Sequence, residues 1–246
     1  MIHALDHIAL GAPSLDAGVA AYCQLLGRQG DGASFQLANI RLELRPAARE
    51  GLAELAFAVR DLAKARHLLE RRALALAPDT STDGVLRIAT QSTHGVPIAL
   101  VASAGDAAPR SPLADGATED AAVAALDHAV VRTPNPERAI ALYAGRLGLD
   151  LRLDRSEPAW GMRLLFFRCG DLIIEVAHDL KAGVGDGPDS FWGLSWRVGD
   201  LAAAHARLVG AGLDVSPIRA GRRPGTRVFT VRGGTLGVPT LMIGPG

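Results

Sequence analysis

The sequence contains few cysteines, few aromatic residues and no excess charge of either sign. Two of the 246 residues are cysteines, and aromatic residues make up 4% of the chain. Cys23 and Cys169 form no CxxC pair and no disulfide framework, so we interpret both as reduced, incidental thiols. Lys and Arg together number 26, as do Asp and Glu. This balance creates no basic surface field for nucleic acid or an anionic membrane, which favours a small-molecule partner.

The chain also lacks a long hydrophobic run and a signal-like start. No stretch reaches the ~18 to 20 apolar residues needed to span a bilayer. The first residues, MIHALDH, contain neither a basic n-region nor an apolar h-region. We therefore expect a cytoplasmic protein with no membrane partner. Hydrophobic residues make up 48% of the chain, enough for one large core or two modest ones, and the length favours two domains.

One segment poor in large apolar side chains divides the chain. Residues 104–121 consist mainly of Ala, Pro, Gly, Ser and Asp. Such residues cannot build a core, so the composition predicts a linker. We predict an N-terminal domain at 1–103 and a C-terminal domain at 122–246, the latter being the active or binding domain.

The two predicted domains begin with the same pattern. Residues 4–10, ALDHIAL, recur as residues 125–131, ALDHAVV, and such internal repeats indicate duplicated structural units. A helix start follows each strand, with Ser14 as N-cap in the first half and Asn135, followed by proline, in the second. A glycine ends each helix.

Each half then contains a second strand that leads into an Asp-capped helix. Residues 55–62, LAFAVRDL, parallel residues 194–201, LSWRVGDL. With the later strand-like runs, the chain reads as four units of one strand, one helix and about three strands. We predict an α+β fold of two domains, each built from paired βαβββ modules. Helices should cover one face of curved mixed sheets, and the other face should enclose a small ligand.

In this order, and occurring twice, these motifs resemble the vicinal oxygen chelate superfamily. That superfamily includes glyoxalase I, extradiol dioxygenases and the bleomycin and fosfomycin resistance proteins. The resemblance covers nearly the whole chain outside the linker. It is carried by the paired LDH strands at 5–7 and 126–128, the LEL and IEV strands at 42–44 and 174–176, and the GVP closings at 95–97 and 237–239.

The resemblance implies a divalent metal, one of Zn, Fe, Mn or Ni, bound by the first and last strands of each module. His128 and Glu175 match these positions in the third module, and Glu175 would also be the catalytic base. The first module matches with His7 and Glu43. The equivalent positions of the second and fourth modules are Glu54, Ala99, Gly193 and Leu241, which do not form the expected set. Two ligands hold a metal poorly, so the second domain must recruit a further ligand or work without metal.

A structural role also explains these residues. His128 and Glu175 each share a strand face with apolar neighbours, as expected for a hydrogen-bonded core histidine and a paired carboxylate. Glu43 lies between Arg41 and Arg45 at a period of two, which favours a solvated row of ion pairs.

The scarce tryptophans favour the second half of the chain as the binding domain. All three lie there, and one of them follows a glycine-rich stretch at 183–187 that has the composition of a mobile flap. Filling of the core is the alternative role for tryptophan. The predicted substrate-binding residues are Trp160, Arg163, His178, Trp192 and Trp196.

Three functions are consistent with the sequence. The first is a metal-dependent enzyme that acts on a small molecule with vicinal oxygens, either a glyoxalase I-like lyase or isomerase or an extradiol dioxygenase-like enzyme. The second is a metal-free small-molecule binding protein of the resistance type. The third is a structural paralogue whose degenerate modules support a homodimer.

Overall fold

The computed structural model describes residues 1–78, 84–103 and 110–246. Residues 104–109 of the predicted linker therefore lie outside the described part. The strands form a six-stranded sheet in the order β2-β3-β1-β4-β6-β5 and an eight-stranded sheet in the order β12-β13-β14-β11-β7-β10-β9-β8. Within the described residues, no helix is both long and apolar enough to cross a bilayer.

The six-stranded sheet contains the first two modules. Its elements are β1 (Ile2–Ala12), α1 (Leu15–Leu26), β2 (Ser34–Gln36), β3 (Arg41–Pro46), β4 (Gly51–Val59), α2 (Leu62–Arg71), β5 (Val85–Arg87) and β6 (Ile98–Ala102). Each module begins with a long strand that leads into a helix, as predicted. Most pairs in this sheet for which the register is known are antiparallel, and β4 and β6 run parallel.

The eight-stranded sheet contains the last two modules. The third module consists of β7 (Val123–Arg132), α3 (Pro136–Ile140), η1 (Ala141–Arg146), β8 (Asp150–Glu157), η2 (Pro158–Trp160), β9 (Met162–Cys169) and β10 (Leu172–Asp179). The fourth consists of β11 (Ser190–Val198), α4 (Leu201–Gly210), β12 (Arg219–Ala220), β13 (Thr226–Val231) and β14 (Thr240–Pro245). Each sheet thus contains two modules that follow one another in the chain, and the predicted glyoxalase-like fold class is confirmed.

The first two modules have fewer strands than predicted. Within the described residues each carries two strands after its helix, whereas the last two modules carry three. In the first module, Arg28 and Asp31 form only isolated bridges. Three glycines between residues 27 and 32 favour this irregular segment of the first module, because glycine disfavours extended strands.

The helices begin at the predicted residues. The Ser14 side chain accepts from the backbone N–H of Ala17, and the Asn135 side chain accepts from that of Arg138. Gly27 ends the first helix with a φ of 66°, a left-handed conformation that favours glycine. Local capping chemistry therefore fixes these helix boundaries.

The described contacts divide the chain into two compact units that cut across the predicted domains. Unit 1 contains Met1–His7, Glu54–Asp106 and Ala129–Trp192. Unit 2 contains Ile8–Ala53, Ala107–His128 and Gly193–Gly246. The domain boundaries at 103 and 122 stay a prediction.

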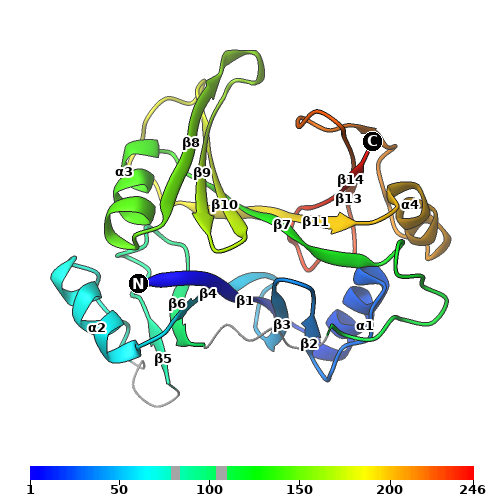
Figure 1. Ribbon diagram of the computed structural model, residues 1–246, viewed down its shortest axis with the longest axis horizontal. Coiled ribbons are helices and arrows are strands. Elements are labelled where there is room, and N and C mark those ends of the chain that lie inside the picture. Colours follow the sequence, from blue (N-terminus) through cyan, green and yellow to red (C-terminus); the bar gives the residue numbers. More distant parts are fainter. Residues whose placement is uncertain (79–83, 104–109) are drawn as a thin grey trace. The chain divides into compact units, whose positions relative to one another are not determined.

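In unit 1, strands β8, β9 and β10 form an antiparallel ribbon (Figure 1). The register places Glu175 opposite Phe166 and Ala177 opposite Leu164. Leu164 and Ala177 pack with Val130 in a buried cluster, against which Phe166 also packs. Glu175 therefore lies on a mostly apolar face of this ribbon.

In unit 2, helix α4 packs on β13 and β14 (Figure 1). The His205 ring meets the Phe229 ring edge-on at 5.0 Å. Register places Phe229 opposite Met242, and Met242 beside Trp196. Because paired residues share a face, one face of β11, β14 and β13 is closed by the helix. The neighbouring positions on the same strands point to the opposite face.

Within unit 2, Arg28 anchors the segment that precedes β7. Its side chain is 2% exposed, and Nε donates to the Val123 carbonyl at 2.7 Å. Nη1 donates to the Ser111 carbonyl at 3.0 Å, and Nη2 pairs with Glu119 at 2.7 Å. A buried guanidinium is stable only with such partners.

We predict that Arg28→Met destabilises the protein by about 2 kcal/mol or more, because two carbonyls lose their buried donor. Urea unfolding of both proteins measures the change. Arg110→Met is the matched control, because exposed Arg110 pairs with the same Glu119 carboxylate at 2.6 Å. The control should cost less than about 1 kcal/mol. Equal losses for the two variants would contradict this role of Arg28.

Candidate functional site around His128

His128 forms a hydrogen-bonded chain with two neighbours in unit 2. Its Nδ1 lies 2.8 Å from Asp127 Oδ2, and its Nε2 lies 2.9 Å from Ser195 Oγ. The His128 side chain is 20% exposed, whereas Ser195 is 3% exposed. Strand β7 supplies the first two residues and β11 supplies the serine. The imidazole is therefore held at both nitrogens and still reaches solvent.

The charge of Asp127 sets the direction of these hydrogen bonds. The hydrogen bond from His128 is the largest cause that holds the pKa of Asp127 below its usual value, and Arg197 and Arg223 act in the same direction. An ionised carboxylate only accepts, so Nδ1 carries the proton. In the neutral ring Nε2 then accepts from the Ser195 hydroxyl. This arrangement turns the basic nitrogen of His128 toward Ser195.

A similar chain repeats in unit 1. His7 Nδ1 lies 2.8 Å from Asp6 Oδ2, and His7 Nε2 lies 3.7 Å from Glu54 Oε1. Glu54 also pairs with Arg87 at 2.9 Å. His7 and Glu54 are both buried. The Asp-His pair is thus common to both halves, whereas the second partner is a carboxylate in one and a hydroxyl in the other.

The fourth-module position that faces His128 differs from the one predicted. The resemblance placed it at Gly193, and the structure places Ser195 there, two residues later on the same face of β11. Ser195 and Asp127 are the site residues that the sequence reasoning missed. Asp127 directly precedes His128 in both LDH copies, so the repeated pair was a usable pattern. No sequence pattern pointed to Ser195, because its contact with His128 spans 67 residues.

Within each unit, the described residues bring together no complete set of metal ligands. The described residues contain no group of three His, Cys, Asp or Glu side chains that could hold one ion. Both ring nitrogens of His128 are engaged, and its β11 partner is a hydroxyl rather than imidazole or carboxylate. In the other chain Arg87 already balances the charge of Glu54. Glu43, the first-module candidate, lies between Arg41 at 2.9 Å and Arg45 at 2.8 Å, as the ion-pair alternative predicts.

Glu175 and His178 lie on β10 in unit 1. Glu175 is 8% exposed and faces the same side as Phe166. His178 is also buried, and its Nδ1 lies 3.1 Å from the Thr133 carbonyl. The roles of Glu175 as metal ligand and base, and of His178 in binding substrate, stay predictions.

Trp160 and Arg163 lie near the β8–β9 turn. Trp160 is exposed, and the Arg155 guanidinium lies 5.6 Å from its ring centre. Arg163 donates to both oxygens of Asp154 at 2.8 and 2.7 Å and to Glu137 at 2.7 Å. These carboxylates raise the pKa of Arg163 above its usual value. Its charge is therefore already balanced within unit 1.

Trp192 and Trp196 differ in environment. Trp192 is exposed in unit 1, with the Arg132 guanidinium 4.8 Å from its ring. Trp196 is fully buried in unit 2 on the α4 side of β11, opposite the face of Ser195. Among the described residues, its Nε1 finds no hydrogen-bond partner. The position of Trp196 matches the core-filling alternative, and the predicted substrate roles of both tryptophans stay predictions.

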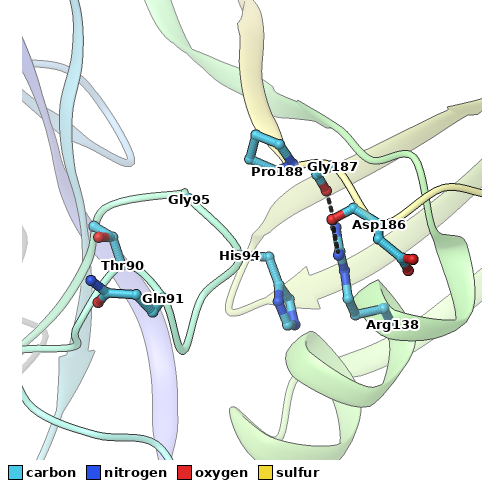
Figure 2. A pocket seen from close by; sticks show the side chains of 8 residues that line it. All are labelled: Thr90, Gln91, His94, Gly95, Arg138, Asp186, Gly187 and Pro188. Carbon is cyan, nitrogen blue, oxygen red and sulfur yellow. Dashed lines mark hydrogen bonds between the residues drawn. The ribbon is translucent and has the colours of Figure 1, made fainter.

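A polar cavity of about 340 Å³ lies elsewhere in unit 1 (Figure 2). Arg138 borders it and donates to the Gly187 carbonyl at 2.6 Å and to Asp189 Oδ1 at 2.9 Å. Figure 2 shows the His94 ring neighbouring Arg138. Burial lowers the pKa of His94, and the charge of Arg138 adds to this effect. The cavity contains none of the predicted site residues.

Part of the chain matches a known protein family. The family model described as "Glyoxalase/Bleomycin resistance protein/Dioxygenase superfamily" matches residues 127–230. These residues, fewer than half of the chain, are similar to that superfamily. The match begins at Asp127 and includes His128, Glu175 and Ser195, so the matched region covers the site. No match was found among curated proteins.

Solved structures of the superfamily type share the fold of the whole chain. The Mn(II)-bound glyoxalase from Novosphingobium aromaticivorans is 16% identical with a TM-score of 0.71, covering 99% of this chain and 82% of its own. A halotolerant catechol dioxygenase is 14% identical with a TM-score of 0.68, covering 100% and 88%. A triple mutant of 4-hydroxymandelate synthase from Streptomyces coelicolor is 13% identical with a TM-score of 0.70, covering 100% and 93%. At such identities the likeness shows the fold.

We predict that protonation of His94 destabilises the protein. The folded state lowers the pKa of His94, so its contribution is fully present above the unfolded pKa of about 6.5 and is lost as pH falls below that value. His94→Gln should weaken the fall in urea-unfolding free energy between about pH 7 and pH 5. His67→Gln, at an exposed position on α2, is the control and should keep the wild-type profile. An unchanged profile for His94→Gln would contradict the prediction.

Proposed function

We propose that the protein is a small-molecule enzyme of this superfamily in which His128 transfers a proton to or from the substrate. The supporting observation is the chain of hydrogen bonds from Asp127 through His128 to Ser195. A catalytic base needs a fixed tautomer and an accessible lone pair. Asp127 provides the first, and rotation of the Ser195 hydroxyl away from Nε2 provides the second.

The three residues have distinct parts in this proposal. Asp127 is a positioning residue, because it holds Nδ1–H and stabilises the imidazolium that forms when Nε2 takes a proton. His128 is the catalytic residue. The Ser195 hydroxyl occupies Nε2 in the free protein, and it can turn to donate to a substrate oxygen when the substrate's acidic proton takes its place.

The proposed substrate carries two neighbouring oxygen atoms. Catechol, a vicinal diol, appears in the name of one structure with the same fold. Such a substrate offers one oxygen to the Ser195 hydroxyl and an acidic O–H or C–H group to His128. The Ser195 hydroxyl and His128 Nε2 lie 2.9 Å apart, so they can contact neighbouring groups of one substrate.

A metal-dependent glyoxalase- or dioxygenase-like enzyme is the second candidate. The Mn(II)-bound glyoxalase with the same fold favours it, as do His128 and Glu175, which the sequence predicts as ligands. A bound divalent ion would act as a Lewis acid on the substrate oxygens. The two candidates differ in the effect of a chelator.

We predict that His128→Gln lowers kcat by about 10²- to 10⁴-fold, because it removes the proton-transferring group. Turnover is measured on a panel of catechols, hemithioacetals and α-hydroxyketones, with oxygen uptake, thioester formation and solvent-deuterium exchange as readouts. Under the first candidate, activity survives EDTA. Loss with EDTA and recovery with Mn(II) would favour the second.

Arg227→Met is the matched control, because Arg227 lies on the α4 side of β13, away from the face of Ser195. It should retain wild-type turnover. Wild-type kcat in His128→Gln would contradict the proposal. Binding of a panel compound without turnover by the wild type would instead indicate a metal-free binding protein.

A further inference from the structure

The face of unit 2 that carries Ser195 continues across three more strands. Ser195 pairs with Leu241 on β14, and Leu241 pairs with Thr230 on β13. Paired residues share a face, so the Ser195 and Thr230 hydroxyls lie on the same side of the sheet. The covering helix α4 lies on the other side, where His205 meets Phe229.

The next row on this face begins and ends with arginine. Arg197 pairs with Ile243, Ile243 pairs with Val228, and Val228 pairs with Arg219 on β12. Val228 and Ile243 are nearly buried, whereas both arginines are exposed. The row is therefore an apolar floor with a cation at each end.

Hydrogen bonds hold Arg219 over this floor. Nη1 donates to Ser216 Oγ at 3.2 Å, and Nη2 donates to Thr230 Oγ1 at 3.3 Å. Within the described part of the chain, Arg219 forms no ion pair with a carboxylate. Two neutral hydroxyls position the guanidinium but leave its charge unbalanced, and an arginine on a sheet face is well suited to receive an anion.

Arg197 is placed beside the histidine chain. Its Nη2 donates to the Leu126 carbonyl at 3.4 Å, and its Nε lies 3.9 Å from Asp127 Oδ1. Its side chain is half exposed. The positive charge of Arg223 also acts on Asp127. The charges of Arg197 and Arg223 together exceed the single negative charge of Asp127, so the surroundings of Asp127 favour an anion.

We infer that this face binds an anionic substrate whose carboxylate or phosphate is bound by Arg219, while the charge of Arg197 at the other end of the row adds to the attraction. The inference rests on the proposed function, because it names the substrate class of the same site. Planar guanidinium groups bind carboxylate and phosphate oxygens in pairs. Val228, Ile243 and Leu241 form the surface against which the carbon part of the substrate packs.

Isothermal titration with three probes tests this inference. Two are anions, 2-hydroxybenzoate and phenyl phosphate, and the third is the neutral 2-hydroxybenzamide. The wild type should bind at least one anion about tenfold or more tightly than the amide, and the tighter anion distinguishes a carboxylate site from a phosphate site. Arg219→Met should reduce this preference about tenfold, equal to about 1.4 kcal/mol, and Arg197→Met should reduce it by a smaller factor.

Arg227→Met provides the control, because it removes the same charge from β13 on the opposite face and should keep the preference. Arg219→Lys, which retains the charge without the planar fork, should restore part of it. The inference is overturned if neither anion binds more tightly than the amide, if Arg219→Met keeps the preference, or if Arg227→Met loses it equally.

The proposed anion site and the proposed proton transfer by His128 are tested by different results. Loss of turnover in His128→Gln without any anion preference in the wild type would leave the proposed function in place and overturn this inference. An anion preference that depends on both arginines, together with normal turnover in His128→Gln, would support the anion site and overturn the role of His128.

Discussion

Side chains along β11, β13 and β14 alternate between two faces, and the proposed site depends on this alternation. One face places Trp196, Met242 and Phe229 under helix α4. The other face carries Ser195 and Arg197, as the same register shows. The hydrophobic packing that holds α4 on the sheet thereby fixes which polar groups can meet a ligand, since a shift of one residue would exchange the two faces.

Both halves of the chain contain the same Asp-His pair. In both copies the carboxylate lies 2.8 Å from the histidine Nδ1. The two pairs differ in the group that contacts the histidine Nε2. Glu54 with Arg87 makes a buried ionic network around His7, whereas Ser195 leaves His128 with a neutral, movable partner. The partly exposed second copy is therefore better suited to proton transfer, and the buried first copy to structural support.

The sequence alone predicted the order of modules, the helix starts and the position of His128, because these depend on local patterns. Asn135 caps a helix by contacting a residue three positions away. Ser195 and Arg87 could not be found in this way, because their contacts with His128 and Glu54 span 67 and 33 residues and depend on strand register. Within the described residues the first module has one strand fewer than the repeat predicts. The glycines between residues 27 and 32 disfavour a regular strand there.

The tautomer of His128 tests the account most directly. Long-range ¹H–¹⁵N correlation spectra of the imidazole at neutral pH report which nitrogen carries the proton, and His128→Gln identifies the signals. We predict that the neutral form of the ring carries its proton at Nδ1, with Nε2 as the acceptor of the Ser195 hydroxyl. A neutral ring protonated at Nε2 would contradict it, because the basic nitrogen would then face Asp127 rather than the substrate.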